Sequence, residues 1–416
     1  MQHPNTGQLV KVFGRIGVLS FGGPAAQIAL MQRELVDNHR WLSESEFLRA
    51  LSFCMVLPGP EAMQMATYAG WRLRGTLGGL IAGGLFVLPG ALVIFALAYG
   101  YAAFGNIPMV QAAFTGIKAA VLVIVLQALF NLSRKALVGA AAWGLAGAAF
   151  LGVFALGLPF PVIIAAAAAF GALTLQDSDK PTPPPFTVPI RDTLTRLTLW
   201  GALWAVPILV LIWSESHFLT DVALFFSKLA VVTFGGAYAV LAYMTQTVVS
   251  DYGWITTAQM IDALGLAETT PGPLILVTQF VAILAGIMAQ GPMLGLIAGL
   301  TALWMTFVPC FLWIFVAAPY LDALTSRPRL NAALQAITAA VVGVILNLAL
   351  WFALHVFFAE VTSARWHAAP LPVAKSLDLQ ALALFALAAI LIFGLKRSIL
   401  QALSLMAGAG VLANLL

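Results

Sequence analysis

Residues 20–28 read SFGGPAAQI and residues 233–241 read TFGGAYAVL, while residues 57–64 read LPGPEAMQ and residues 270–277 read TPGPLILV. Both motifs return after the same interval of 213 residues, and Trp41 recurs as Trp254 at that interval too. The chain therefore contains two related halves, each with an FGG break and a PGP break in apolar surroundings. This pattern predicts a transporter built from structural repeats.

Composition defines the class of protein. Hydrophobic residues make up 62% of the 416 residues and charged residues only 9%, which predicts an all-α polytopic membrane protein that packs against the lipid bilayer. Lys11 and Arg15 interrupt the first apolar run, so we expect a mature first segment and no removable signal peptide. The net charge of +4 reflects basic residues that flank the membrane, and no nucleic-acid partner is expected.

Apolar stretches long enough to span a bilayer, or nearly so, predict about thirteen transmembrane segments. In the first half and the connection they cover 9–31, 47–71, 76–103, 107–133, 136–156, 159–175 and 195–213. In the second half they cover 220–244, 257–288, 292–319, 330–358, 378–395 and 398–416. We expect an N-terminal repeat at 1–175, a linker and connecting helix at 176–215, and a C-terminal repeat at 216–416.

The distribution of lysine and arginine predicts the orientation. With the N-terminus inside, the cytoplasmic side receives eleven basic residues: Arg72, Arg74, Arg134, Lys135, Lys180, Arg191, Arg196, Arg327, Arg329, Lys396 and Arg397. The opposite side receives Arg33, Arg40, Arg365 and Lys375, the first two in a loop with Glu34, Asp37, Glu44 and Glu46. Seven crossings precede the second half, so the two repeats are expected to be inverted relative to each other.

The four breaks are the first candidate site. A helix that begins after such a break directs free backbone N–H groups and a positive dipole end into the protein, which suits an anion. The expected backbone contributors are Gly22, Gly23, Pro58, Gly59, Pro60, Gly235, Gly236, Pro271, Gly272 and Pro273. The alternative is that the breaks are packing kinks, which are common in membrane helices.

Two cations recur with the breaks. Arg15 precedes Ser20 by five residues, and Lys228 precedes Thr233 by five residues, again 213 residues apart. A cation inside a membrane is costly and needs a compensating anion, so this pair predicts a site for a compact dianion. The alternative is that each side chain extends to its nearest interface.

Other polar groups near the breaks complete the candidate site. Lys118, in an otherwise uncharged segment, is either a substrate ligand or the partner of a carboxylate, whereas its counterpart Thr338 is uncharged. Glu61 and Glu268 are candidates for proton coupling, although Glu61 equally suits a helix cap. The remaining candidates are Ser20, Gln64, Thr67, Thr233, Thr269 and Thr270, whose hydroxyls by default donate to helix carbonyls.

The sequence offers no constellation for other chemistry. HExxH, GxSxG, P-loop and CxxC motifs do not occur, and the histidines lack metal-ligand spacing, so neither an enzyme, a metal site nor a cofactor is expected. Cys54 and Cys310 lie in apolar stretches and are expected to be buried thiols. Without a nucleotide site, transport is expected to depend on a gradient.

The run FGGPAAQIALMQRELVDNHRWLSESEFL, followed by LPGPEAMQMATYAGWRLRGTLGGLIAGGLFVLPG, resembles the chromate ion transporter family in its long form with two homologous halves. The motif residues carry over to Phe21, Gly22, Gly23, Pro24, Gln27, Arg33, Glu34, Trp41, Pro58, Gly59, Pro60, Glu61, Tyr68 and Gly70. In the second half Ala237 replaces the proline and Leu274 the glutamate, so the site is not expected to be fully two-fold.

The resemblance implies efflux of chromate, a tetrahedral dianion, across the inner membrane of a bacterium, which confers chromate resistance, with sulfate as a competing oxyanion. Our main hypothesis is therefore a secondary active exporter that works by alternating access. The alternatives are a passive anion channel and a transporter for sulfate or another oxyanion. A homodimer is a further expectation.

Overall fold

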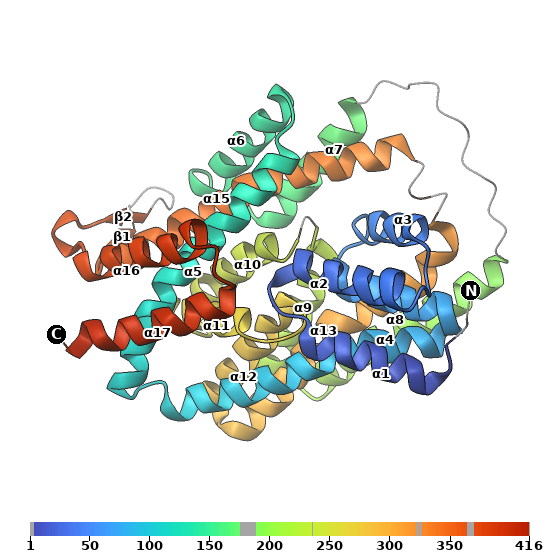
Figure 1. The fold of residues 1–416 in the computed structure, drawn as a ribbon, viewed down its shortest axis with the longest axis horizontal. Helices are drawn as coiled ribbons and strands as arrows, with labels where there is room; N and C mark the ends of the chain where they lie inside the picture. The colour runs from blue at the N-terminus through green and yellow to red at the C-terminus, as the bar shows by residue number, and fades with distance from the viewer. Residues whose placement is uncertain are drawn as a thin grey trace. The chain divides into compact units, whose positions relative to one another are not determined.

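The structure is a computed structural model that describes residues 4–174, 189–234, 236–321, 324, 327–363 and 370–415 (Figure 1). Gly235, most of the predicted linker at 176–192, and Arg365 lie outside the described residues. The described chain is helical apart from one short antiparallel pair of strands, β1 (Val361–Ser363) and β2 (Pro370–Pro372). An all-α fold is what the composition predicts.

The first half forms seven α-helices and a π-helical turn within its described residues. These are α1 (Thr6–Leu19), α2 (Gly23–Gln32), the π-turn η1 (Arg33–Asn38), α3 (Glu44–Cys54), α4 (Glu61–Phe104), α5 (Pro108–Ala136), α6 (Ala140–Phe154) and α7 (Phe160–Thr174). The continuous assignment of α4 hides a turn, because Arg74 (φ −144°, ψ 31°) and Gly75 (φ 60°, ψ −156°) are not helical. Residues 61–104 therefore form two helices, as predicted from the separate apolar runs before and after this point.

The connecting helix and the second half repeat this order. They comprise α8 (Ile190–Trp213), α9 (His217–Val232), α10 (Ala237–Gln246), η2 (Thr247–Asp251), α11 (Thr257–Glu268), η3 (Leu274–Leu276), α12 (Val277–Gln290), α13 (Pro292–Ala317), η4 (Ala318–Tyr320), α15 (Pro328–Phe357), η5 (Ala374–Ser376), α16 (Leu379–Ala389), η6 (Ile390–Gly394) and α17 (Ile399–Leu415). Five helical segments of the described chain are long and apolar enough to cross a membrane: Glu61–Phe104, which contains the turn at Arg74 and Gly75, Pro108–Ala136, Ile190–Trp213, Pro292–Tyr320 and Pro328–Phe357.

Local sequence signals explain several of these boundaries. Ser43 caps α3 through a capping box with Glu46, and Thr256 caps α11 through a capping box with Gln259. Ser43 and Thr256 are again 213 residues apart. The repeat thus extends to the side chains that fix where helices begin.

The two segments around the first FGG and PGP breaks fold back on themselves. Arg15 on α1 lies 3.8 Å from Glu34, and Arg72 near the end of the first part of α4 lies 3.7 Å from Glu46 at the start of α3. Arg74 donates to the carbonyl oxygen of Pro4 at 2.6 Å, next to the start of α1. Each break is therefore the tip of a helical hairpin whose two arms return to the same end.

This geometry corrects the predicted orientation of one loop. We expected residues 33–46 on the side opposite Arg72 and Arg74, because 9–31 and 47–71 were each counted as a crossing. The contacts of Glu34 and Glu46 instead place this loop at the same end as Arg72. Hydropathy cannot separate a hairpin from a crossing, since both contain the same run of apolar residues.

The described chain forms two compact units, and each takes segments from both halves. Unit 1 contains residues 1–99, 176–237 and 270–331, and unit 2 contains residues 100–175, 238–269 and 332–416. In unit 1, α13 packs against α12, α8 and α9. All four breaks, at 20–24, 58–60, 233–236 and 270–273, belong to unit 1 as far as they are described.

In unit 2, helices of one half pack against helices of the other half. The hairpin of α16 and α17 packs against α5 of the first half, where Gly410 closely faces Ala112 and Gly116. In the same way α7 of the first half faces α15, with Gly171 against Ala332 and Ala336. Small residues where these helices touch let the helix backbones approach each other closely, as is usual in membranes.

Candidate substrate site at the crossing of the four breaks

Two backbone hydrogen bonds join the breaks of one half to those of the other. The N–H of Gly59 donates to the carbonyl oxygen of Thr233 at 2.9 Å, and the N–H of Gly272 donates to the carbonyl oxygen of Ser20 at 2.9 Å. Each residue of one bond is 213 positions from its counterpart in the other, so the bonds obey the repeat. We call this set of contacts the crossing.

The carbonyl groups at the crossing are presented by two equivalent turns. α1 ends before Ser20 (φ −78°, ψ 66°) and α9 ends before Thr233 (φ −75°, ψ 89°). Ser20 and Thr233 are each the central residue of an inverse γ-turn. The turns are closed by hydrogen bonds from Phe21 N to Leu19 O at 2.9 Å and from Phe234 N to Val232 O at 3.0 Å. The carbonyl of the central residue is thereby turned out of its own helix and toward the other half.

The hydroxyl groups of these residues are engaged within their own helices. Ser20 Oγ donates to Ile16 O at 2.6 Å, and Thr233 Oγ1 donates to Leu229 O at 2.5 Å. Thr67 and Thr269 likewise donate to Met63 O at 3.0 Å and to Leu266 O at 2.7 Å. These four hydroxyls therefore donate to carbonyls of their own helices, as expected by default. At the crossing, Ser20 and Thr233 contribute their backbone carbonyl groups.

Glycine is required at both donors. Gly59 has φ 120° and Gly272 has φ 86°, values that side chains other than hydrogen rarely allow. A Cβ on Gly59 would lie 2.9 Å from Cys310 Sγ and 2.9 Å from Gln64 Nε2. A Cβ on Gly272 would lie 3.3 Å from the carbonyl oxygen of Phe86. The flanking residues Pro271 and Pro273 are buried, as is Pro60, while Pro58 is partly buried.

Two glutamines of the first half tie down the PGP carbonyls. Gln27 donates to Gly272 O at 2.7 Å and Gln64 donates to Pro58 O at 2.7 Å. Their counterparts at the 213-residue interval are Val240 and Val277, which lack a polar group. The contact of Gln27 with the second half was not predicted, although the family resemblance marks this residue.

Three described helices of unit 1 begin at the tips. α2 begins at Gly23 with Gly22 (φ 88°) as its N-cap, α4 begins at Glu61 directly after Pro60, and η3 begins at Leu274 after Pro273. Gly236, with φ 99°, precedes α10. The first-turn N–H groups of α2 and α4 have no intrahelical acceptor and carry the positive end of each helix dipole.

The two recurring cations have different surroundings. Arg15 has a 65% exposed side chain and lies 3.8 Å from Glu34, whose side chain is only 3% exposed. Glu34 is thus the carboxylate that pairs with Arg15, and the sequence did not identify it as a partner. Lys228 is exposed. In the second half, the residue that corresponds to Glu34 is Thr247.

Lys118 has a carboxylate partner within unit 2. Its Nζ lies 3.4 Å from Asp262 Oδ1, and Tyr101 donates its hydroxyl to Asp262 Oδ2 at 2.8 Å. Asp262 is 4% exposed. Of the two interpretations of Lys118, pairing with a carboxylate is the one the structure supports, and neither Asp262 nor Tyr101 was predicted from the sequence.

The two coupling candidates also differ. Glu61 is the first residue of α4, the position expected for a residue that stabilises a helix N-terminus. Glu268 ends α11, is 7% exposed, and accepts a hydrogen bond from the Tyr238 hydroxyl at 2.6 Å. Thr270 is buried two residues further along. Within the described part of the chain, no cluster of three or more His, Cys, Asp or Glu residues could hold a metal ion.

An apolar helical chain with two related halves, whose interrupted helices meet inside the protein, is a multi-pass membrane protein of the transporter class. More specifically, the chain belongs to the chromate transporter family, whose model matches residues 7–172 and 220–413. This is a family of transporters and not of enzymes.

Curated relatives cover most of the chain. It is 30% identical over 339 residues to a probable chromate transport protein of Synechococcus elongatus (81% of this chain, 82% of the relative). It is 33% identical over 344 residues to a chromate transport protein of Pseudomonas aeruginosa (81% and 79%), and 28% identical over 358 residues to one of Cupriavidus metallidurans (81% and 80%). No solved structure matches the chain.

Proposed function

We propose that the protein is a secondary active transporter that exports chromate across a bacterial inner membrane by alternating access and so confers chromate resistance. The relatives named as chromate transport proteins support the substrate. The observation that carries the mechanism is the crossing, in which Gly59 binds Thr233 and Gly272 binds Ser20. Inverted repeats that meet at broken helices are how many secondary carriers build a central site.

In this proposal the repeats are residues 1–175 and 216–416, joined by 176–215, and the segments predicted at 9–31 and 47–71 are hairpins that do not cross the membrane. The dianion is held by the backbone at the breaks together with Arg15 and Lys228, while Glu61 and Glu268 are available for proton coupling. The loop with Arg33 and Arg40 lies at the same end as Arg72. This adds basic residues to the side that already has most of them, which supports a cytoplasmic N-terminus.

The membrane potential alone favours export. Moving two negative charges out of a cell that is negative inside releases about 4.6 kcal/mol per 100 mV, twice the value for one charge. A uniporter, an anion exchanger and a proton-coupled carrier are therefore all energetically adequate. Sulfate, which has the same shape and charge as chromate, is the expected competitor.

The test is chromate uptake into everted vesicles that contain the protein, with the membrane potential and the pH gradient collapsed separately. Concentrative uptake that sulfate inhibits is expected. Arg15→Gln and Lys228→Gln should each abolish it, while Lys135→Gln, an exposed control at the end of α5, should not. Flux that never exceeds equilibrium would identify a passive channel, and full activity of both variants would exclude Arg15 and Lys228 from the site.

A further inference from the structure

A cavity of about 300 Å³ lies in unit 1, away from the crossing, at the other end of the hairpin formed by α3 and the first part of α4. Arg49 of α3 and Arg72 of α4 line it with Glu46, and the aromatic rings of Tyr68 and Trp71 form part of its wall. Residues after α13, including Pro319, also line it. We call it the arginine cavity.

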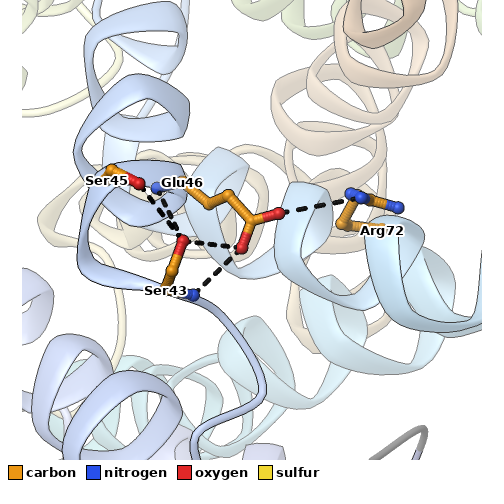
Figure 2. A network of polar contacts seen from close by, with 4 residues as sticks. All are labelled: Ser43, Ser45, Glu46 and Arg72. Atoms are coloured by element: carbon orange, nitrogen blue, oxygen red, sulfur yellow. Dashed lines mark hydrogen bonds and ion pairs between the residues drawn. The ribbon is translucent and has the colours of Figure 1, made fainter. Parts of the chain in front are cut away.

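A hydrogen-bond network fixes the charges at its edge (Figure 2). Glu46 Oε2 accepts from the backbone N–H of Ser43 at 3.0 Å and from Ser43 Oγ at 2.8 Å, while Oε1 lies 3.7 Å from Arg72 Nη2. The capping box therefore holds Glu46, which pairs with the half-exposed side chain of Arg72 at the edge of the cavity. Arg49, one helical turn after Glu46, adds a second guanidinium group.

The charges do not cancel. Two guanidinium groups and one carboxylate line the arginine cavity, so it carries a net positive charge. Guanidinium groups present several N–H donors in a fixed plane, which suits an oxyanion with several oxygens better than a single-point acceptor.

We propose that the arginine cavity binds a tetrahedral oxyanion before it reaches the crossing, so that Arg49 and Arg72 form a capture site on the side from which the substrate enters. This inference rests on the proposed function for the direction of entry, because Arg72 lies at the end that the basic residues assign to the cytoplasm. The phosphate of a lipid headgroup shares the chemistry of the free dianion, and its binding in this cavity would overturn the capture role.

The first experiment measures KM for chromate in everted vesicles. Arg49→Gln and Arg72→Gln should each raise KM about tenfold, the value of one lost charged hydrogen bond, and leave kcat within about twofold. Lys11→Gln, which removes an exposed cation from α1 outside the cavity, is the matched control and should change neither value.

Glu46→Gln separates a binding role from a structural one. If the arginine cavity binds an oxyanion, loss of this carboxylate removes a repulsive charge and should lower KM about threefold. If the network only holds α3 against α4, Glu46→Gln and Arg72→Gln break the same ion pair and should have the same effect. A rise in KM for both would overturn the proposal.

Binding measured without transport keeps this test separate from the proposed function. Calorimetric titration of the full-length protein in phosphatidylcholine nanodiscs with chromate and with sulfate should show weaker binding in both arginine variants. If the wild type transports chromate but the variants bind it normally, only the capture site is wrong. If the wild type transports no chromate, the titration still tests whether the arginine cavity binds an oxyanion.

Native mass spectrometry in nanodiscs that contain phosphatidylglycerol distinguishes the source of the oxyanion. Retention of that lipid by the wild type, and its loss in Arg49→Gln and Arg72→Gln, would assign the arginine cavity to lipid phosphate. Unchanged retention, together with weaker chromate binding, would assign it to the free dianion. Unchanged lipid retention and unchanged anion binding would leave the cavity without an oxyanion and overturn the proposal.

Discussion

Gly59 donates its backbone N–H to the carbonyl oxygen of Thr233 at 2.9 Å, and so binds a break of the first half to a break of the second. The repeat supplies the same bond again between Gly272 and Ser20. Backbone atoms alone make both contacts, so they depend on the path of the chain and on the absence of side chains at the two glycines.

Gly59→Ala and Gly272→Ala should each lower the free energy of unfolding by about 1–3 kcal/mol, because both positions have positive φ. Gly59→Ala should be the more damaging, since its Cβ would press on Cys310 and Gln64. Gly84→Ala is the control, as a Cβ there meets no atom within 4 Å. Thermal unfolding in detergent measures all three, and equal melting temperatures for wild type and Gly59→Ala would contradict the role of the crossing.

Ser20→Ala should leave the affinity for chromate within about twofold of wild type. The hydroxyl hydrogen of Ser20 is donated to Ile16, and the group at the crossing is the backbone carbonyl, which alanine retains. The KM of chromate uptake in everted vesicles reports this affinity. A tenfold loss in this variant would show that the hydroxyl itself binds substrate.

Lys118→Gln should destabilise the protein by about 3–5 kcal/mol, because it leaves the carboxylate of Asp262 buried without its cation. Adding Asp262→Asn should recover part of that loss, which a double-mutant cycle in thermal unfolding detects. Lys135→Gln, at the end of the same helix, serves as the control. Additive effects of the two substitutions would mean that the pair is not coupled.

Glu46 should make stability fall in acid. The backbone N–H of Ser43, then its hydroxyl and the charges of Arg72 and Arg49, lower the pKa of Glu46 against an opposing effect of burial. The carboxylate form therefore stabilises the fold above the ordinary pKa of glutamate, about 4.3, and this contribution disappears as the pH falls through the lowered pKa. Solvent screens the partly exposed pair, so the contribution is at most about 1 kcal/mol.

The measurement for Glu46 is the melting temperature between about pH 6 and pH 3. Glu46→Gln should lose the part of the acid dependence that this carboxylate provides. Glu44→Gln removes a charge from the same first turn of α3 and controls for net charge. Identical pH profiles for wild type and Glu46→Gln would contradict the assignment.

The halves should also work as separate chains. Two polypeptides divided in the segment between Thr174 and Pro189 should reconstitute chromate uptake when they are produced together, because the crossing and the packing of α17 on α5 both join one half to the other. Each alone should be degraded. Activity from the first polypeptide alone would contradict this interdependence.

The sequence predicted the repeat, the place of the breaks and the recurring cations, because glycine, proline and charge in apolar runs leave a clear pattern. It did not predict that the breaks are hairpin tips, since the return of α2 alongside α1 is visible only in the contact of Arg15 with Glu34. The crossing itself has no side-chain signature beyond glycine. Asp262 was missed because its partner Lys118 is distant in the chain.

The short helix α6 of unit 2 bears on the membrane around the protein. It has 15 residues, about 22 Å of helix, whereas the hydrocarbon layer is about 30 Å thick. Its exposed apolar side chains include Trp143 and Leu151. A helix shorter than the hydrocarbon layer is accommodated by a locally thinner bilayer or by a shallow position, so the acyl-chain length of the surrounding lipids should affect the stability of this part of the protein.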